Sequence, residues 1–122
     1  MVDLEDVLNL KPSELSGGMK KRVALARALV TNPSYILYDE PTSDLDPFNA
    51  ARIRELIINL SNSNRGFIVV THEILDALKL ARRFMFLKGG SILFDGNKEQ
   101  FLNSDLKELR SFLGDWNEEI KK

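Results

Sequence analysis

Two short apolar runs, each followed at once by polar residues, constrain the fold more than any other feature of the sequence. The runs are residues 35–38 and 67–70, and they are followed by Asp39-Glu40 and by Thr71-His72-Glu73. About thirty residues separate them, which is the length of a crossover connection between parallel strands. We therefore expect a right-handed βαβ unit whose strands are buried on both faces.

The connection between these runs reads as one amphipathic helix. Asp46 is a typical N-cap residue, and Pro47 suits the first helical position. The apolar residues that then recur at helical spacing are Ile53, Leu56, Ile57 and Leu60. Further helices are expected at residues 3–8, 19–30, 74–80, 98–102 and 106–113. Residues 84–87 and 92–94 flank Gly89-Gly90 and predict a β-hairpin.

Composition narrows the function classes. The chain has 122 residues, 43% of them apolar, a net charge of −1 and no cysteine. One compact core is expected at this length. The absence of cysteine excludes a disulfide framework and a thiolate metal site. The chain has no surplus of basic residues that would predict nucleic-acid binding. No apolar run is long enough to span a bilayer, and the acidic start is unlike a signal peptide, so a cytoplasmic location is expected.

The residues after the two strands suit phosphoryl-transfer chemistry. Ligands of open parallel sheets bind beyond the carboxyl ends of the strands, where Asp39, Glu40, His72 and the turn at 43–46 fall. One carboxylate can hold hydrated magnesium while its neighbour orients and deprotonates a water molecule. The alternative is a pair of solvated turn acids.

Four motifs, in order, resemble the ATP-binding domains of ABC transporters over roughly residues 1–100. Leu15-Ser16-Gly17-Gly18-Met19 resembles the ABC signature, residues 35–41 resemble the Walker B strand with its glutamate, Ser43-Asp44-Leu45-Asp46 resembles the D-loop, and Thr71-His72-Glu73 resembles the switch-histidine segment. The implied fold is α/β, a partial P-loop NTPase with a mostly parallel sheet flanked by helices.

The resemblance implies ATP and Mg²⁺ as ligands and a role for each motif residue. Ser16, Gly17, Gly18 and Met19 would meet the γ-phosphate of a nucleotide held by a second, head-to-tail domain. Asp39 would hold Mg²⁺ through water, Glu40 would be the general base, and His72 would sense the γ-phosphate. The structural alternatives are an N-cap at Ser16, a glycine turn and an incidental histidine. Asp46 would serve as both D-loop residue and N-cap.

Departures from the family pattern refine this picture. Met19 replaces the usual signature glutamine, and with residues 20–23 it resembles lipid-trafficking and solvent-resistance importers. Lys20, Lys21 and Arg22 are read as a solvated helix face. Asp44 stands where the D-loop usually has a small residue. No Gly-x-x-x-x-Gly-Lys-Ser/Thr word occurs, so the phosphate-binding Walker A strand and loop are missing.

The expected organisation is therefore the carboxyl-terminal part of one domain, with a signature region at 1–32, a Walker B to switch-histidine core at 33–96 and a helical tail at 97–122. The expected function is ATP hydrolysis within a complete subunit that lies at the inner membrane face and binds permease subunits. Alone, the chain is expected to be inactive and to self-associate through unpaired strand edges. The alternatives are a non-catalytic module that supplies a signature in trans, or part of a soluble ABC-class ATPase.

Overall fold

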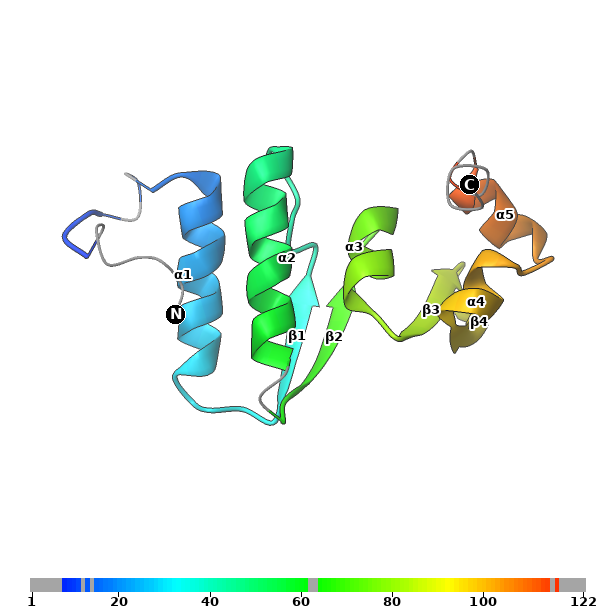
Figure 1. Ribbon diagram of the computed structural model, residues 1–122, viewed down its shortest axis with the longest axis horizontal. Helices are drawn as coiled ribbons and strands as arrows, with labels where there is room; N and C mark the ends of the chain where they lie inside the picture. Colours follow the sequence, from blue (N-terminus) through cyan, green and yellow to red (C-terminus); the bar gives the residue numbers. More distant parts are fainter. Residues whose placement is uncertain (1–7, 12, 14, 62–63, 115, 117–122) are drawn as a thin grey trace. The chain divides into compact units, whose positions relative to one another are not determined.

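The computed structural model describes residues 8–11, 13, 15–61, 64–114 and 116 (Figure 1). The chain divides into two compact units, Met1–Asp76 and Ala77–Lys122, with the boundary inside α3 (Ile74–Leu80). The single core expected from length is therefore wrong, because each unit buries its own apolar residues. The helix expected at residues 3–8 falls almost entirely outside the described residues.

The first unit contains the predicted βαβ arrangement. Its elements are α1 (Gly17–Leu29), β1 (Tyr35–Asp39), α2 (Pro47–Ser61), β2 (Gly66–Val70) and the start of α3. Strands β1 and β2 pair in parallel, with Leu37 opposite Ile68 and Asp39 opposite Val70. The parallel pairing and the intervening helix are confirmed, and the polar residues that follow both strands lie at the same end of the sheet.

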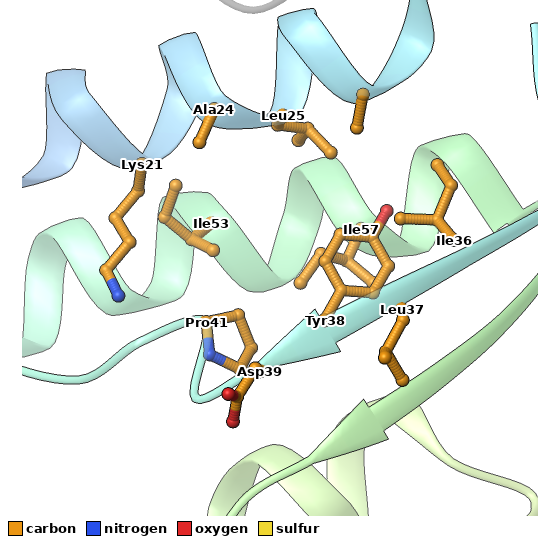
Figure 2. A pocket seen from close by; sticks show the side chains of 11 residues that line it. Lys21, Ala24, Leu25, Ile36, Leu37, Tyr38, Asp39, Pro41, Ile53 and Ile57 are labelled. Carbon is orange, nitrogen blue, oxygen red and sulfur yellow. The ribbon is translucent and has the colours of Figure 1, made fainter. Parts of the chain in front are cut away.

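Within the described part of the first unit, only one face of this sheet is covered. Ile36 is 7% exposed, whereas its neighbours Tyr35 and Leu37 are 74% and 67% exposed. Figure 2 shows side chains of α1 and α2 on the same side of β1 as Ile36 and Tyr38, while Leu37 and Asp39 leave the strand on its other side. The expectation of strands buried on both faces is wrong, because a run of apolar residues does not distinguish a covered face from an exposed one.

Helix α2 begins where the sequence predicts. The Asp46 carboxylate accepts a hydrogen bond from the backbone N–H of Asn49, at 2.9 Å between Oδ1 and N, and so caps the helix. Ile53 and Ile57 on its inner face are 3% and 1% exposed and form the centre of the first core. At the far end of the sheet, Arg65 donates hydrogen bonds to the loop that precedes β1.

The second unit is built on the predicted hairpin, β3 (Arg83–Lys88) and β4 (Ser91–Asn97), which pair antiparallel. Gly89 and Gly90 have φ of 58° and 78°, conformations that glycine adopts without a Cβ penalty. Helices α4 (Lys98–Leu102) and α5 (Lys107–Leu113) follow, as expected. The residues that form this core include Phe84, Phe101, Leu109 and Leu113.

Within the described part of the chain, β2 pairs only with β1 and β3 pairs only with β4. No helix there is long and apolar enough to cross a bilayer.

Candidate functional site

The predicted glutamate and histidine are in direct contact. Glu40 Oε1 lies 2.9 Å from His72 Nδ1 and accepts a second hydrogen bond from the His72 backbone N–H at 3.0 Å. The hydroxyl of Thr71 donates to the other carboxylate oxygen at 3.3 Å. An ionised carboxylate can only accept, so the His72 ring carries a proton on Nδ1. The contact thus turns Nδ1 of the imidazole toward the carboxylate and keeps a proton on that nitrogen.

The electrostatics of the pair favour a charged carboxylate. Loss of hydration would raise the pKa of Glu40, but the hydrogen bonds and charge of His72, together with the Thr71 hydroxyl, outweigh it and hold that pKa below its ordinary value. The hydrogen bond from Glu40, followed by its charge, raises the pKa of His72. Glu40 therefore has the protonation state that a general base needs at neutral pH.

The two adjacent acids differ in backbone conformation and exposure. Glu40 has a φ of 48°, which is uncommon for a residue with a Cβ, and its N–H donates to the Val70 carbonyl at 2.8 Å. Asp39 is the last residue of β1 and its side chain is exposed. An exposed carboxylate at a strand end suits Mg²⁺, which binds one or two protein carboxylates and takes its other ligands from water and phosphate. Among the described residues, no group of three or more potential metal ligands occurs.

The signature-like segment forms the amino terminus of α1. The Ser16 hydroxyl accepts a hydrogen bond from the Met19 N–H at 3.2 Å, and the Ser16 N–H donates to the Met19 sulfur at 3.4 Å. This reciprocal arrangement is a capping box in which a thioether replaces the usual carboxylate or amide. The N-cap function of Ser16, offered as the structural alternative, is therefore present. No hydrogen bond joins Ser16 to Asp39, Glu40 or His72 in the described structure.

The D-loop residues lie beside this helix start. A Cβ on Gly17 would come 3.4 Å from Leu45, and one on Gly18 would come 3.1 Å from Asn49 Oδ1. Asn49 in turn donates to Asp46 at 2.7 Å, so the amino termini of α1 and α2 are packed together. Asp44 has a φ of 61° and an exposed side chain.

Sequence reasoning missed the functions of Lys21 and Arg22. Lys21 Nζ donates to the Glu40 carbonyl at 3.1 Å and to Ser43 Oγ at 3.0 Å, and Arg22 is only 5% exposed. The solvated face predicted for residues 20–22 is therefore wrong for two of the three. The contacts of Lys21 join residues about twenty positions apart in sequence, and no local charge pattern could have revealed them.

A buried polar cluster was missed as well. Asp76, which is fully buried, accepts hydrogen bonds from Thr42 Oγ1 at 2.5 Å and from Arg54 Nη1 at 2.9 Å. Helical spacing in α2 assigns apolar neighbours to the core but gives no sign that an arginine is buried among them.

An open pocket of about 250 Å³ lies between α1, α2 and β1, and Figure 2 shows its lining. Most of its walls are aliphatic side chains such as Leu25, Ile53 and Ile57, and Lys21 and Asp39 are the charged residues among those that line it. The polar contacts described above lie at its rim and beyond it, so the pocket itself has few groups that could orient a ligand.

Comparison with known proteins agrees with the motifs. The sequence model described as "ABC transporter" matches residues 1–43. The arginine transport ATP-binding protein ArtM of Bacillus subtilis is 42% identical over 113 residues, covering 92% of this chain and 47% of ArtM. The glutamine transport ATP-binding protein GlnQ of Escherichia coli is 43% identical over 103 residues, covering 84% and 43%. This chain spans about half the length of the curated relatives it matches.

Solved structures show the same fold. The ATP-binding cassette MJ0796, a dimer in a post-hydrolysis state bound to ADP and Pi, is 39% identical with a TM-score of 0.68 and is matched over 76% of this chain and 40% of its own. The ADP conformation of MJ1267, an ATP-binding cassette of an ABC transporter, is 29% identical with a TM-score of 0.79, over 93% and 46%. The predicted α/β fold, part of an ABC ATPase domain with a parallel sheet and flanking helices, is confirmed.

The predicted lipid-trafficking subgroup is not supported. The relatives found are named for arginine, L-cystine, methionine and glutamine transport. The subgroup prediction failed because the residues on which it was based have local structural functions. Met19 completes a capping box, and Lys21 and Arg22 make contacts within the first unit.

Proposed function

We propose, from the premise that this chain belongs to the ABC transporter ATP-binding family, that it is part of a subunit that binds and hydrolyses ATP to drive a membrane transporter. The observation that carries the proposal is the contact between Glu40 and His72 at the carboxyl end of a parallel sheet. An ionised carboxylate that is hydrogen-bonded to an imidazole at the end of a parallel sheet is suited to orienting a water molecule for attack on a phosphoryl group.

In this proposal each site residue has one task. Glu40 accepts a proton from the attacking water. His72, in the doubly protonated form that its raised pKa favours, donates from Nδ1 to the carboxylate and from Nε2 to the terminal phosphate. Asp39, exposed at the end of β1, would hold Mg²⁺ through water, and the ion would neutralise charge on the phosphates when bound. The acidic pair and the histidine come from two adjacent strands, so one nucleotide can contact all three.

The amino terminus of α1 would serve a second nucleotide-binding domain. Ser16 caps a 13-residue helix that begins with Gly17, Gly18 and Met19, and the positive end of its dipole favours an anion. Ser16 and Gly17 are exposed, as residues that contact a partner's nucleotide must be. The turn formed by Ser43, Asp44, Leu45 and Asp46 would face the same partner. The dimeric state of the similar cassette MJ0796 supports a pair of such domains, which we propose to be arranged head to tail.

The transported substrate is proposed to be an amino acid or a related small polar solute. The support comes from relatives named for arginine, L-cystine and glutamine transport. The subunit would lie at the inner face of the membrane and contact permease subunits there. The chain's own residues supply the ATPase part of this function and none of the solute specificity.

The test measures Mg²⁺-dependent ATP binding and turnover after this chain is combined with a separately expressed amino-terminal half taken from ArtM, which supplies a phosphate-binding loop. We expect turnover by the combination and none by the chain alone. Glu40→Gln should abolish turnover and retain binding, whereas the matched control Glu73→Gln should retain turnover. Hydrolysis that survives Glu40→Gln would exclude Glu40 as the base. Binding without hydrolysis would support the alternative, a non-catalytic module that supplies its signature residues to another protein's site.

A further inference from the structure

The contact between Glu40 and His72 is exposed and cannot hold its own geometry. The side chain of Glu40 is 31% exposed and that of His72 is 70% exposed. Exposed ion pairs contribute little net free energy, because water screens them and both side chains lose conformational freedom. Something else must therefore hold the two segments that carry these residues.

The buried cluster described above connects those same two segments. Thr42 follows Glu40 by two residues and is 6% exposed, while Asp76 follows His72 by four residues and is fully buried. Their side chains meet at 2.5 Å between Thr42 Oγ1 and Asp76 Oδ2. The loop after β1 and the first turn of α3 are thus joined directly behind the exposed contact.

A third residue anchors the cluster to the core. Arg54, in the middle of α2, donates to the second oxygen of Asp76 at 2.9 Å, and the side chains of the two residues are 10% and 1% exposed. Arg54 follows Ile53, at the centre of the first core. Hydrogen bonds to a charged group are strong in such low-dielectric surroundings, so this link is much stiffer than the exposed one.

The chain between cluster and site is short on both sides. The Ser43 N–H donates to the Glu40 carbonyl at 3.2 Å, which closes a tight turn around Thr42. The Glu73 N–H donates to Thr71 Oγ1 at 2.9 Å, which closes a second turn immediately before α3. A displacement at Thr42 or Asp76 is therefore passed to Glu40 and His72 with few free torsions to absorb it.

We propose that Thr42, Asp76 and Arg54 form a positioning network that sets the distance between Glu40 and His72. None of the three is a catalytic residue, because none reaches the exposed site itself. The inference rests on the proposed function for its consequence in catalysis, but the geometric claim applies to the chain without any nucleotide.

The test compares Thr42→Val, which removes the hydroxyl and keeps the shape, with Thr42→Ser, which keeps the hydroxyl. His72 is the sole histidine of the chain, so the ¹⁵N and Nδ1–H resonances of its ring are assigned without ambiguity. At one fixed pH we expect the full chain and Thr42→Ser to show a protected, hydrogen-bonded Nδ1–H. Thr42→Val should lose this signal while its backbone amide spectrum stays native. Ser61→Ala, at the end of α2, is the control for loss of an unrelated hydroxyl.

An unchanged Nδ1–H in folded Thr42→Val would overturn the proposal. If Thr42→Val does not fold, the double variant Arg54→Met/Asp76→Leu replaces the network by apolar groups, an exchange that is often tolerated. Retention of the hydrogen-bonded Nδ1–H in that variant would equally overturn the proposal, and its loss with native amides would support it.

The catalytic measurement uses the chain combined with the amino-terminal half of ArtM, as in the test of the proposed function. Thr42→Val should lower kcat by roughly ten- to a hundredfold and leave KM for ATP unchanged, since misplacement of a base affects the transition state. Absence of turnover in the unsubstituted protein would contradict the proposed function alone, because the resonance measurement needs no nucleotide. A native kcat in Thr42→Val would count against the network alone.

Discussion

The ammonium group of Lys21 in α1 donates a hydrogen bond to the backbone carbonyl of Glu40, at 3.1 Å between Nζ and O. The same ammonium donates to Ser43 Oγ at 3.0 Å. Since α1 begins at the glycines that are proposed to face a second nucleotide, one side chain connects that helix to the catalytic loop and to the D-loop turn. The two proposed half-sites of this chain are thus mechanically linked, and the Ser43 N–H also donates directly to the Glu40 carbonyl at 3.2 Å.

Lys21→Met should destabilise the first unit. The variant keeps most of the aliphatic stem but loses two hydrogen bonds from a charged donor, which together contribute about 1–2 kcal/mol at a partly buried position. Urea-induced unfolding followed by circular dichroism measures the loss. Lys20→Met is the control, because Lys20 is exposed and surface substitutions change stability by about 0.5 kcal/mol or less. Equal effects of the two substitutions would show that the Lys21 contacts contribute nothing.

Glu40→Gln should lower the pKa of His72. The hydrogen bond from Glu40 is the first cause of the raised His72 pKa and its charge is the second, so both are lost or weakened by the neutral amide. Nuclear magnetic resonance titration of the sole histidine measures the change. Glu73→Gln should lower the pKa of His72 by less, because Glu73 acts on it only through its charge and has a smaller effect than Glu40. A larger effect at Glu73 would mean that the imidazole faces the wrong carboxylate.

The contribution of the Glu40–His72 pair to stability should vary with pH. Because the pKa of His72 is raised in the folded chain, its protonated imidazole stabilises the fold below the ordinary histidine pKa of 6.5. This stabilisation is lost as the pH rises through the raised pKa. Because the pKa of Glu40 is lowered in the folded chain, its ionised carboxylate stabilises the fold above the ordinary glutamate pKa of 4.5. This stabilisation is lost as the pH falls through the lowered pKa. The difference in stability between the native chain and Glu40→Gln should therefore be largest between about pH 4.5 and 6.5. A difference that grows steadily above this window would contradict the pairing.

Arg54→Met should strongly destabilise the first unit. It leaves the carboxylate of Asp76 buried without its cation, and breaking a buried ion pair in this way costs about 3–5 kcal/mol. Adding Asp76→Leu should recover much of the loss, since the unpaired charge is then removed as well. Thermal and urea unfolding of the single and double variants supply the comparison. If the double variant were less stable than the single one, the unpaired charge of Asp76 would not be the main cause of the lost stability.

Gly17 and Gly18 occupy successive positions at the start of α1 but should respond differently to alanine. At Gly17 a Cβ would make ordinary contact with Leu45, so Gly17→Ala should stabilise α1 by roughly 0.5–1 kcal/mol through helix propensity. At Gly18 the Cβ would come 3.1 Å from Asn49 Oδ1, and Asn49 is held by Asp46. Gly18→Ala should therefore lose that gain or destabilise. Matching melting curves for the two variants would mean that Asn49 moves aside freely.

Much of the fold could be predicted because local chemistry determines it. Asp46 and Pro47 locate the start of α2, and Gly89-Gly90 locates the hairpin, since each position needs a residue type that few others replace. The juxtaposition of Glu40 and His72 was also within reach, because parallel strands bring their carboxyl ends to one edge.

What sequence reasoning missed depends on residues far apart in the chain. Lys21 and Glu40 are nineteen residues apart, and Thr42 and Asp76 are thirty-four apart. No helical or strand period relates such positions, so a lysine on a helix face has the same local pattern whether it is solvated or bonded. The exposed face of β1 was missed for the same reason, because burial of one face depends on whether another segment covers it.

Self-association of the isolated chain is the prediction that depends most on this exposed face. Leu37 and Ile68 are paired across β1 and β2 on the open face and are 67% and 59% exposed, beside strand edges that pair with nothing in the described structure. Apolar surface next to a free edge is a template for another chain. We expect sedimentation to show dimers or larger species that increase with concentration, and the double variant Leu37→Lys/Ile68→Lys to shift them toward monomer. Ile58→Lys is the control, since Ile58 is a 40% exposed apolar residue on α2 and lies outside the sheet. A monodisperse monomer with one cooperative melt in the unsubstituted chain would contradict the prediction, because the open face and edges would then be stable in water.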